Sequence, residues 1–218
     1  KVGVIVEVNC ETDFVGRNEG FIAMVNDAAK FIAEKAEKNE GTGADLAPMQ
    51  GWEAGRTVDE SVKEAIQKIG EKIEIRRFVR YQAPDGGQLG SYIHLGGKIG
   101  VLVELQGGTT DLAKDLAMHV AASQPQYATA DQVPADEVAK EKAVLMGSAD
   151  MASKPEAVRE KMVEGRISKF FEQICLVEQP FVKDPGQTVK DLLAKSNASV
   201  TRFTRFGLGE GLEKKVDN

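Results

Sequence analysis

The chain has few of the side chains that build metal and redox sites. It contains two cysteines and two histidines among 218 residues. Cys10 and Cys175 lie in separate strand-like segments, and no Cys-x-x-Cys pair occurs, so the sequence indicates neither a metal site nor a redox dithiol. A disulfide between them and two buried thiols are both compatible with the sequence, and a reducing compartment would favour the thiols. We expect no metal and no cofactor.

Long apolar runs and excess positive charge are also missing. No apolar segment is long enough to cross a bilayer, and no signal peptide opens the sequence, so we expect a cytoplasmic protein without a membrane partner. The formal net charge is −6, from 28 Lys and Arg against 34 Asp and Glu. This balance argues against direct nucleic-acid binding, because such proteins neutralise phosphates with basic side chains.

Recognisable catalytic motifs are absent as well. Gly97-Lys98 does not belong to a phosphate-binding loop, because Tyr92 stands where the first loop glycine is needed. His94 lies at a strand end, and His119 lies on an apolar helix face, where a hydrogen-bonded core histidine is expected. Neither has the spacing of a known triad, although triads assemble in space. The sequence therefore favours a protein that is not an enzyme.

An internal repeat organises the chain. Residues 1–8, Lys-Val-Gly-Val-Ile-Val-Glu-Val, return as residues 98–105, Lys-Ile-Gly-Val-Leu-Val-Glu-Leu, and a Thr-Asp pair follows each copy at Thr12-Asp13 and Thr110-Asp111. A second similarity relates residues 71–75 to residues 172–176 at nearly the same spacing. Two similarities in one order indicate a duplicated unit.

The local patterns predict an α+β fold in which antiparallel sheets pack on helices. Alternating apolar residues predict a strand at 2–8, and helical spacing predicts a helix over 18–38. Residues 41–55 are glycine-rich and are expected to be a loose loop. Capping-box spacing at Thr57 and Glu60 begins a helix that Gly70 ends. Tight glycine turns then separate strands at 73–82, 89–94 and 98–105, which predicts an antiparallel meander.

The second copy carries an insertion. Apolar and small residues recur at spacings of four and three, which predicts a coiled-coil helix that Ser153-Lys154-Pro155 ends, and a second helix follows from Glu156 to about Phe171. The seam residues are Val138, Lys142, Leu145, Ala149 and Ala152. A helical hairpin that mediates association is one interpretation, and packing of both helices on the second sheet is the other.

These patterns divide the chain into three parts. We expect a first core subdomain at residues 1–97, a second core subdomain at 98–134 and 172–218, and the inserted hairpin at 135–171.

One turn near the start does not look like an ordinary surface turn. In the stretch Glu7-Val-Asn-Cys-Glu-Thr-Asp-Phe-Val15, Thr12 and Asp13 favour a capped turn, and the apolar residues Phe14 and Val15 follow at once. Phe14 either tucks into its own core or projects as a contact for another protein. The sequence of this stretch resembles the signature motif of the elongation factor Ts family, whose members are the bacterial nucleotide exchange factors for elongation factor Tu.

Further stretches carry the same resemblance in family order. They are 68–77, 90–94 with 99–103, 117–123, 160–166, 179–182 and 206–211. The sequence departs from the family pattern in three ways: it begins at the core strand without the small N-terminal helical domain, it stops before a further C-terminal helix, and Gly16 stands where Ala or Ser is usual. We therefore expect a core fragment or the ordered part of a longer protein.

The resemblance implies a function and a set of contact residues. It implies a guanine nucleotide exchange factor that promotes GDP release from elongation factor Tu during translation elongation, by wedging Asp13 and Phe14 near the partner's magnesium site. The implied contact residues are Thr12, Asp13, Phe14, Val15, Ile69, Gly70, His94 and Val182. A two-lobed scaffold that associates through the hairpin is the competing class, and GDP release from elongation factor Tu separates the two.

Overall fold

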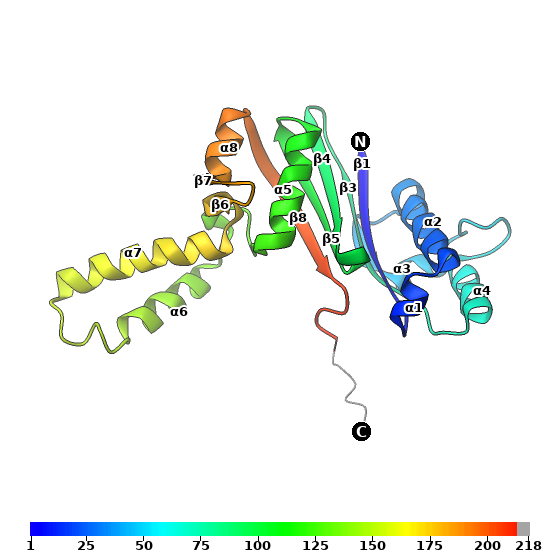
Figure 1. The fold of residues 1–218 in the computed structure, drawn as a ribbon, viewed down its shortest axis with the longest axis horizontal. Helices are drawn as coiled ribbons and strands as arrows, with labels where there is room; N and C mark the ends of the chain where they lie inside the picture. Colours follow the sequence, from blue (N-terminus) through cyan, green and yellow to red (C-terminus); the bar gives the residue numbers. More distant parts are fainter. Residues whose placement is uncertain (213–218) are drawn as a thin grey trace, which may run out of the picture.

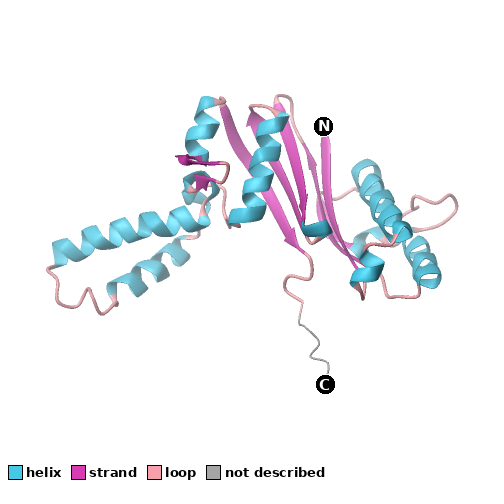
Figure 2. Cartoon of the chain, in the orientation of Figure 1, coloured by secondary structure: helices cyan, strands magenta, loops and turns pink. Residues whose placement is uncertain are grey.

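The computed structural model describes residues 1–212. Two antiparallel sheets stack face to face, helices cover their outer faces, and a helical hairpin projects to one side (Figure 1). Ile5, Val79 and Leu102 belong to the apolar cluster between the two sheets. The secondary-structure colouring separates the central strands from the flanking helices (Figure 2). The predicted α+β class is confirmed.

The first sheet has the strand order β1-β3-β2. These strands are β1 (Val2–Asn9), β3 (Glu74–Gln82) and β2 (Glu40–Thr42). The outer face is covered by α2 (Glu19–Lys35) and α4 (Val58–Ile69). Val4, Val6 and Val8 all join the cluster beneath these helices, as the alternating pattern predicts. The capping box at Thr57 begins α4, and the left-handed Gly70 (φ 83°) ends it, as expected.

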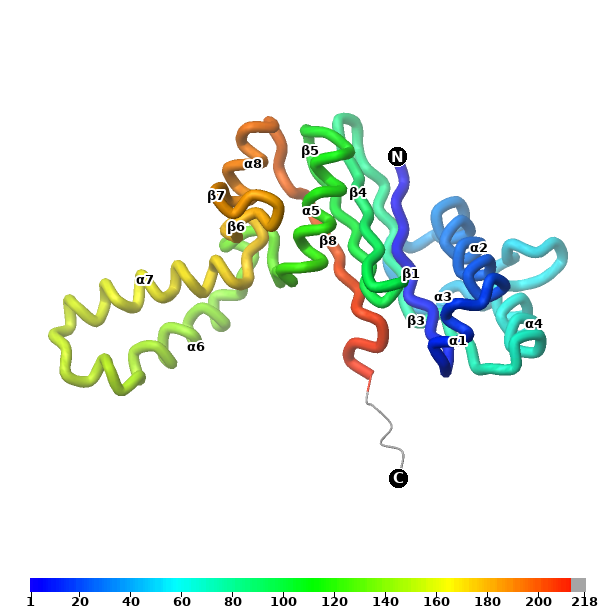
Figure 3. The backbone as a smooth tube through the Cα atoms, viewed as in Figure 1, coloured from blue at the N-terminus to red at the C-terminus, as the bar shows by residue number. Residues whose placement is uncertain are grey.

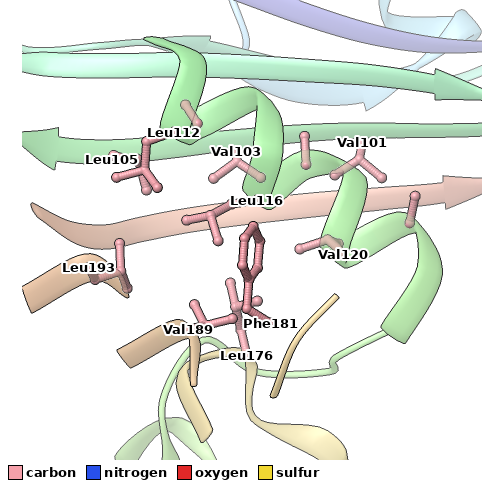
Figure 4. Packing of buried hydrophobic residues seen from close by; sticks show 13 residues of the cluster. Val101, Val103, Leu105, Leu112, Leu116, Val120, Leu176, Phe181, Val189 and Leu193 are labelled. Atoms are coloured by element: carbon pink, nitrogen blue, oxygen red, sulfur yellow. The ribbon is translucent and has the colours of Figure 1, made fainter. Parts of the chain in front are cut away.

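The second sheet has the order β4-β5-β8. Its strands are β4 (Gly87–His94), β5 (Ile99–Gly107) and β8 (Ala198–Gly207), and the covering helices are α5 (Thr110–Ser123) and α8 (Val189–Lys195). Val101, Val103 and Leu116 meet in this core (Figure 4). Burying each such side chain stabilises the fold by about 1.5–3 kcal/mol.

The three strands expected to form one meander belong to two different sheets. β3 pairs with β1 and β2, whereas β4 pairs with β5. β4 therefore lies in the second sheet although it precedes residue 97. The division into subdomains stays a prediction, and its last residues, 213–218, lie outside the described part of the chain.

The first internal repeat has a structural counterpart. Glu7 on β1 and Glu104 on β5 each lie beside a β-bulge, with side chains only 3% exposed. Each pairs with an arginine of the neighbouring strand, Arg77 at 2.6 Å and Arg202 at 2.9 Å. The second similarity relates unlike elements, because residues 71–75 lead into β3 whereas residues 172–176 end a helix.

The expectation of a loose loop at 41–55 is wrong over its first part. Residues of this stretch complete β2 and form α3 (Gly43–Leu46), where Thr42 and Asp45 build a capping box. Leu46 is 2% exposed in the core, and Trp52 packs edge-on against Phe31. The burial of Leu46 and the packing of Trp52 thus order a stretch whose glycine content favours flexibility.

The inserted hairpin is present, with a shorter first helix than expected. α6 (Ala135–Met146) ends at Gly147, so Ala149 and Ala152 lie in turns instead of continuing the seam. α7 (Glu156–Ile174) runs antiparallel to it, and the pair extends away from both sheets (Figure 3). Packing of both helices on the second sheet is therefore wrong. Met151 in the connection is fully buried with Val163 and Ile167.

Short elements complete the fold. They are α1 (Asp13–Gly16), η1 (Leu95–Gly97), η2 (Ala130–Gln132), η3 (Leu176–Glu178), β6 (Pro180–Phe181) and β7 (Asp184–Thr188). Cys10 directly follows β1, and Cys175 lies between α7 and η3 instead of in a strand; both thiols are free. Over residues 1–212, no helix is long and apolar enough to span a membrane.

Candidate functional site

The Thr12–Val15 turn presents an exposed aromatic side chain on a firm base. Thr12 caps α1, and its hydroxyl accepts a hydrogen bond from the Val15 N–H at 3.3 Å. Val15 points into the first core with 8% exposure, whereas Phe14 is 89% exposed. Phe14 therefore does not tuck into its own core. An aromatic side chain held in solvent by a capped turn is suited to contact with another molecule.

A carboxylate from a distant part of the chain anchors this turn. Glu71 accepts hydrogen bonds from the Glu11 N–H (3.2 Å), the Thr12 N–H (3.0 Å) and the Thr12 hydroxyl (2.6 Å). Glu11 returns the contact by accepting from the Lys72 N–H at 2.9 Å. A four-residue helix is unstable alone, so these bonds and buried Val15 hold the turn in place.

Ile69 and Gly70 are brought to the turn by the same anchor. Both lie at the end of α4, immediately before Glu71. Ile69 is half-buried against the first core, and Gly70 is exposed with open space around its Cα. Of the predicted contact residues, these two therefore lie beside Thr12–Val15.

The connection between β4 and β5 lies on the other side of the turn. Lys98 Nζ lies 3.5 Å from Asp13 Oδ1, and both side chains are largely exposed. His94, at the end of β4, stacks on Tyr92, whose hydroxyl lies 2.9 Å from His94 Nδ1. α1, this connection and the end of β8 lie along the lower edge of the two sheets in Figure 3. His94 thus belongs to the same region as Asp13.

Val182 occupies a different region, between β6 and β7. It is 44% exposed, and its N–H donates to His119 Nδ1 at 3.1 Å. His119 Nε2 lies 2.9 Å from Gln179 Oε1, so the ring donates there and is held as the neutral Nε2–H tautomer. Burial lowers the pKa of His119. The expected core histidine is confirmed, and its role is to hold the Val182 loop.

The sequence did not identify Glu71, Lys98 or Gln179 as parts of these sites. Glu71 follows the helix-ending Gly70, and Gln179 begins the Gln-Pro-Phe-Val stretch, but neither position indicates its distant partner. The contacts of Glu71 with Thr12 and of Gln179 with His119 join residues 59 and 60 positions apart, and Lys98 is farther still from Asp13 along the chain. Only the three-dimensional fold reveals them.

One cysteine, Cys10, lies beside the turn. Burial, followed by the nearby Glu71 carboxylate, raises the pKa of the Cys10 thiol, so it is a poor nucleophile. Within residues 1–212, no three Cys, His, Asp or Glu side chains are grouped as a metal site requires. The region consists of the exposed Phe14 ring, the neighbouring Lys98–Asp13 ion pair and the end of α4 at Gly70.

Comparison with known proteins places the chain in a family. A family model described as elongation factor TS matches residues 11–210. Elongation factor Ts of Alkalilimnicola ehrlichii is 48% identical over 217 residues, which cover 99% of this chain and 72% of that protein. The match includes the Thr12–Val15 turn and both regions described above. The chain therefore belongs to the elongation factor Ts family.

Proposed function

We propose that this chain is a translation elongation factor that promotes GDP release from elongation factor Tu. The family supports the general role, and one observation supports the contact: Phe14 is 89% exposed on a turn whose neighbours are capped, buried and hydrogen-bonded. An exposed ring on a mobile loop would lose conformational entropy on binding. A ring on a fixed base loses less, so more of its burial contributes to binding.

Phe14 acts as a wedge in this proposal. It enters the nucleotide-binding domain of elongation factor Tu next to the magnesium site and displaces elements that hold the ion. Magnesium demands near-octahedral oxygens at short distances, so a small displacement weakens its coordination and with it the grip on the diphosphate. Asp13 meets polar groups of the partner, and Thr12 and Val15 fix the direction of the ring.

The remaining contact residues extend the interface on two sides. Ile69 and Gly70 approach the partner beside the turn, because Glu71 ties the end of α4 to Thr12. His94 contributes from the β4–β5 connection. Val182 makes a separate contact from the β6–β7 loop, to another domain of the same partner, and His119 holds it there.

The coupling is thermodynamic and involves no covalent step. If the chain weakens GDP binding by a given factor, GDP weakens binding of the chain by the same factor. The chain therefore accelerates release without selecting which nucleotide rebinds. By this proposal it binds neither GDP nor magnesium itself.

The Phe14→Ala variant tests the proposal. Because Phe14 is exposed, its removal leaves no cavity, and the isolated chain should melt as the parent does. A buried aromatic contact is worth about 2 kcal/mol or more, so kcat/KM for GDP release should fall about thirtyfold. Val2→Thr, which changes another exposed apolar side chain at the start of β1, is the matched control. Full exchange by a stably folded Phe14→Ala chain would refute the proposal.

We also propose that the hairpin mediates self-association. Val144 on α6 and Val158 on α7 are 68% and 44% exposed, and the hairpin extends away from both sheets (Figure 1). Apolar side chains on a projecting arm are suited to a second copy. Sedimentation of the parent chain and of a double variant with serine at both positions tests this. A parent chain that stays monomeric at high concentration would contradict it.

A further inference from the structure

Leu95 adopts a backbone conformation that leucine rarely takes. It opens the η1 turn with φ 51°, and Gly96 and Gly97 follow with φ 63° and 97°. The left-handed region brings Cβ close to the following carbonyl oxygen, which is why glycine or asparagine usually occupies it. Two of the three left-handed positions here carry glycine, and the first carries a large apolar side chain.

The side chain of Leu95 is not explained by the fold. It is 62% exposed, and it belongs to none of the apolar clusters of the described residues. Leucine at this position therefore strains the backbone without filling the core. Strained, exposed residues that the fold does not need are found at sites of function.

Leu95 lies next to the Phe14 turn. Lys98 closes the η1 turn, since its N–H donates to the His94 carbonyl at 3.1 Å, and its Nζ reaches Asp13 at 3.5 Å. The Lys98 carbonyl accepts from the Leu208 N–H at 2.8 Å. Leu208 is 48% exposed, so Lys98 links three segments that each carry an exposed apolar residue, namely Phe14, Leu95 and Leu208.

The charges in this surface compensate one another. Lys98 and Asp13 carry opposite charges and lie 3.5 Å apart, so their charges offset one another where these segments meet. Such a surface fits an apolar partner surface with a neutral centre better than it fits a charged one. It is continuous with the Phe14 contact of the proposed function.

We propose that Leu95 is a second apolar contact to elongation factor Tu, beside the one that Phe14 makes, and that binding is the reason for its strained backbone. This inference rests on the proposed function. Leu95 packs against an apolar area of the partner's nucleotide-binding domain and sets the angle at which Phe14 enters.

Substitution by glycine separates fold from binding. Leu95→Gly relieves the left-handed strain, so the melting temperature of the isolated chain should rise. GDP release should become at least fivefold less efficient, mainly through a higher KM for elongation factor Tu. Leu95→Asn introduces a residue that tolerates the left-handed conformation but has less backbone freedom than glycine. It should show the same loss of exchange. Val2→Thr, an exposed position at the start of β1 and far along that strand from the Phe14 turn, should change neither quantity.

Each alternative outcome overturns a definite statement. A lower melting temperature for Leu95→Gly would show that the fold needs the side chain. Exchange lost with glycine but kept with asparagine would assign the effect to loop rigidity. Unchanged GDP release in both Leu95 variants overturns this inference. Phe14→Ala, measured in the same assay, shows whether the proposed function also fails.

Discussion

Removal of the Glu71 carboxylate should release the Phe14 turn without unfolding the chain. The Glu71→Ala variant loses three hydrogen bonds, from the Glu11 N–H, the Thr12 N–H and the Thr12 hydroxyl. Val15 stays in the core and the Thr12 hydroxyl still caps α1, so the turn loses its anchor but keeps its own contacts.

The size of the effect follows from the number and setting of these bonds. A hydrogen bond contributes about 0.5–1.5 kcal/mol net, and water replaces part of that at this exposed position, so we expect a total loss of about 1–2 kcal/mol. If the loss falls on the turn alone, the fraction of ordered turn decreases by up to about thirtyfold, and the apparent affinity decreases by the same factor. Global melting should change little.

Exchange kinetics and amide hydrogen exchange measure the two consequences. KM for elongation factor Tu should rise severalfold with a smaller change in kcat, and protection of the amides of residues 11–16 should fall. Glu74→Ala is the control, because it removes an exposed carboxylate only three residues from Glu71. The Glu74 carboxylate lies 3.9 Å from Lys72 Nζ, and the variant should behave as the parent does. A Glu71→Ala chain with parental KM and parental amide protection would refute the anchoring argument.

Two further variants probe the turn and the Val182 loop. Gly16→Ala adds a Cβ whose only neighbour within 4 Å is Cys10 Sγ, at 3.9 Å. Thermal melting should therefore show an isolated chain that is more stable by about 0.5–1 kcal/mol, with nucleotide exchange intact. A lower stability would contradict this. Burial lowers the pKa of His119 below its usual 6.5, so stability is complete above pH 6.5 and decreases as the pH falls from there through the folded-state pKa. Melts across this range should show the decrease in the parent and a smaller one in His119→Gln; equal slopes would contradict the assignment.

Local chemistry made much of the fold predictable. The Thr57 capping box, the left-handed Gly70 and the alternation of Val4, Val6 and Val8 each depend on residues within a few positions, and each is confirmed. Thr12 caps its turn for the same reason. Where neighbours in sequence decide the structure, the sequence pattern is sufficient.

Long-range contacts decided the features that were wrong or missed. The turn pattern after β3 is that of a hairpin, yet β3 pairs with β1, because burial between two sheets outweighs proximity in sequence. The heptad spacing continues to Ala152, yet α6 ends at Met146 and buries Met151 in the connection instead. The exposure of Phe14 follows from Glu71 and Val15 together, and the sequence left that choice open.

One buried carboxylate connects the parts of the candidate site. Glu7 accepts from Arg76 and Arg77 of β3 and, at 2.7 Å, from the Gly209 N–H beyond β8. β1 carries the turn that presents Phe14, and the segment after β8 carries Leu208, which bonds to Lys98. A buried charge is costly unless it is fully paired, so this arrangement holds one geometry of the two sheets. Phe14 follows β1 of one sheet and Leu95 follows β4 of the other, so in the proposed complex the fixed stacking of the sheets sets the distance between these two contacts.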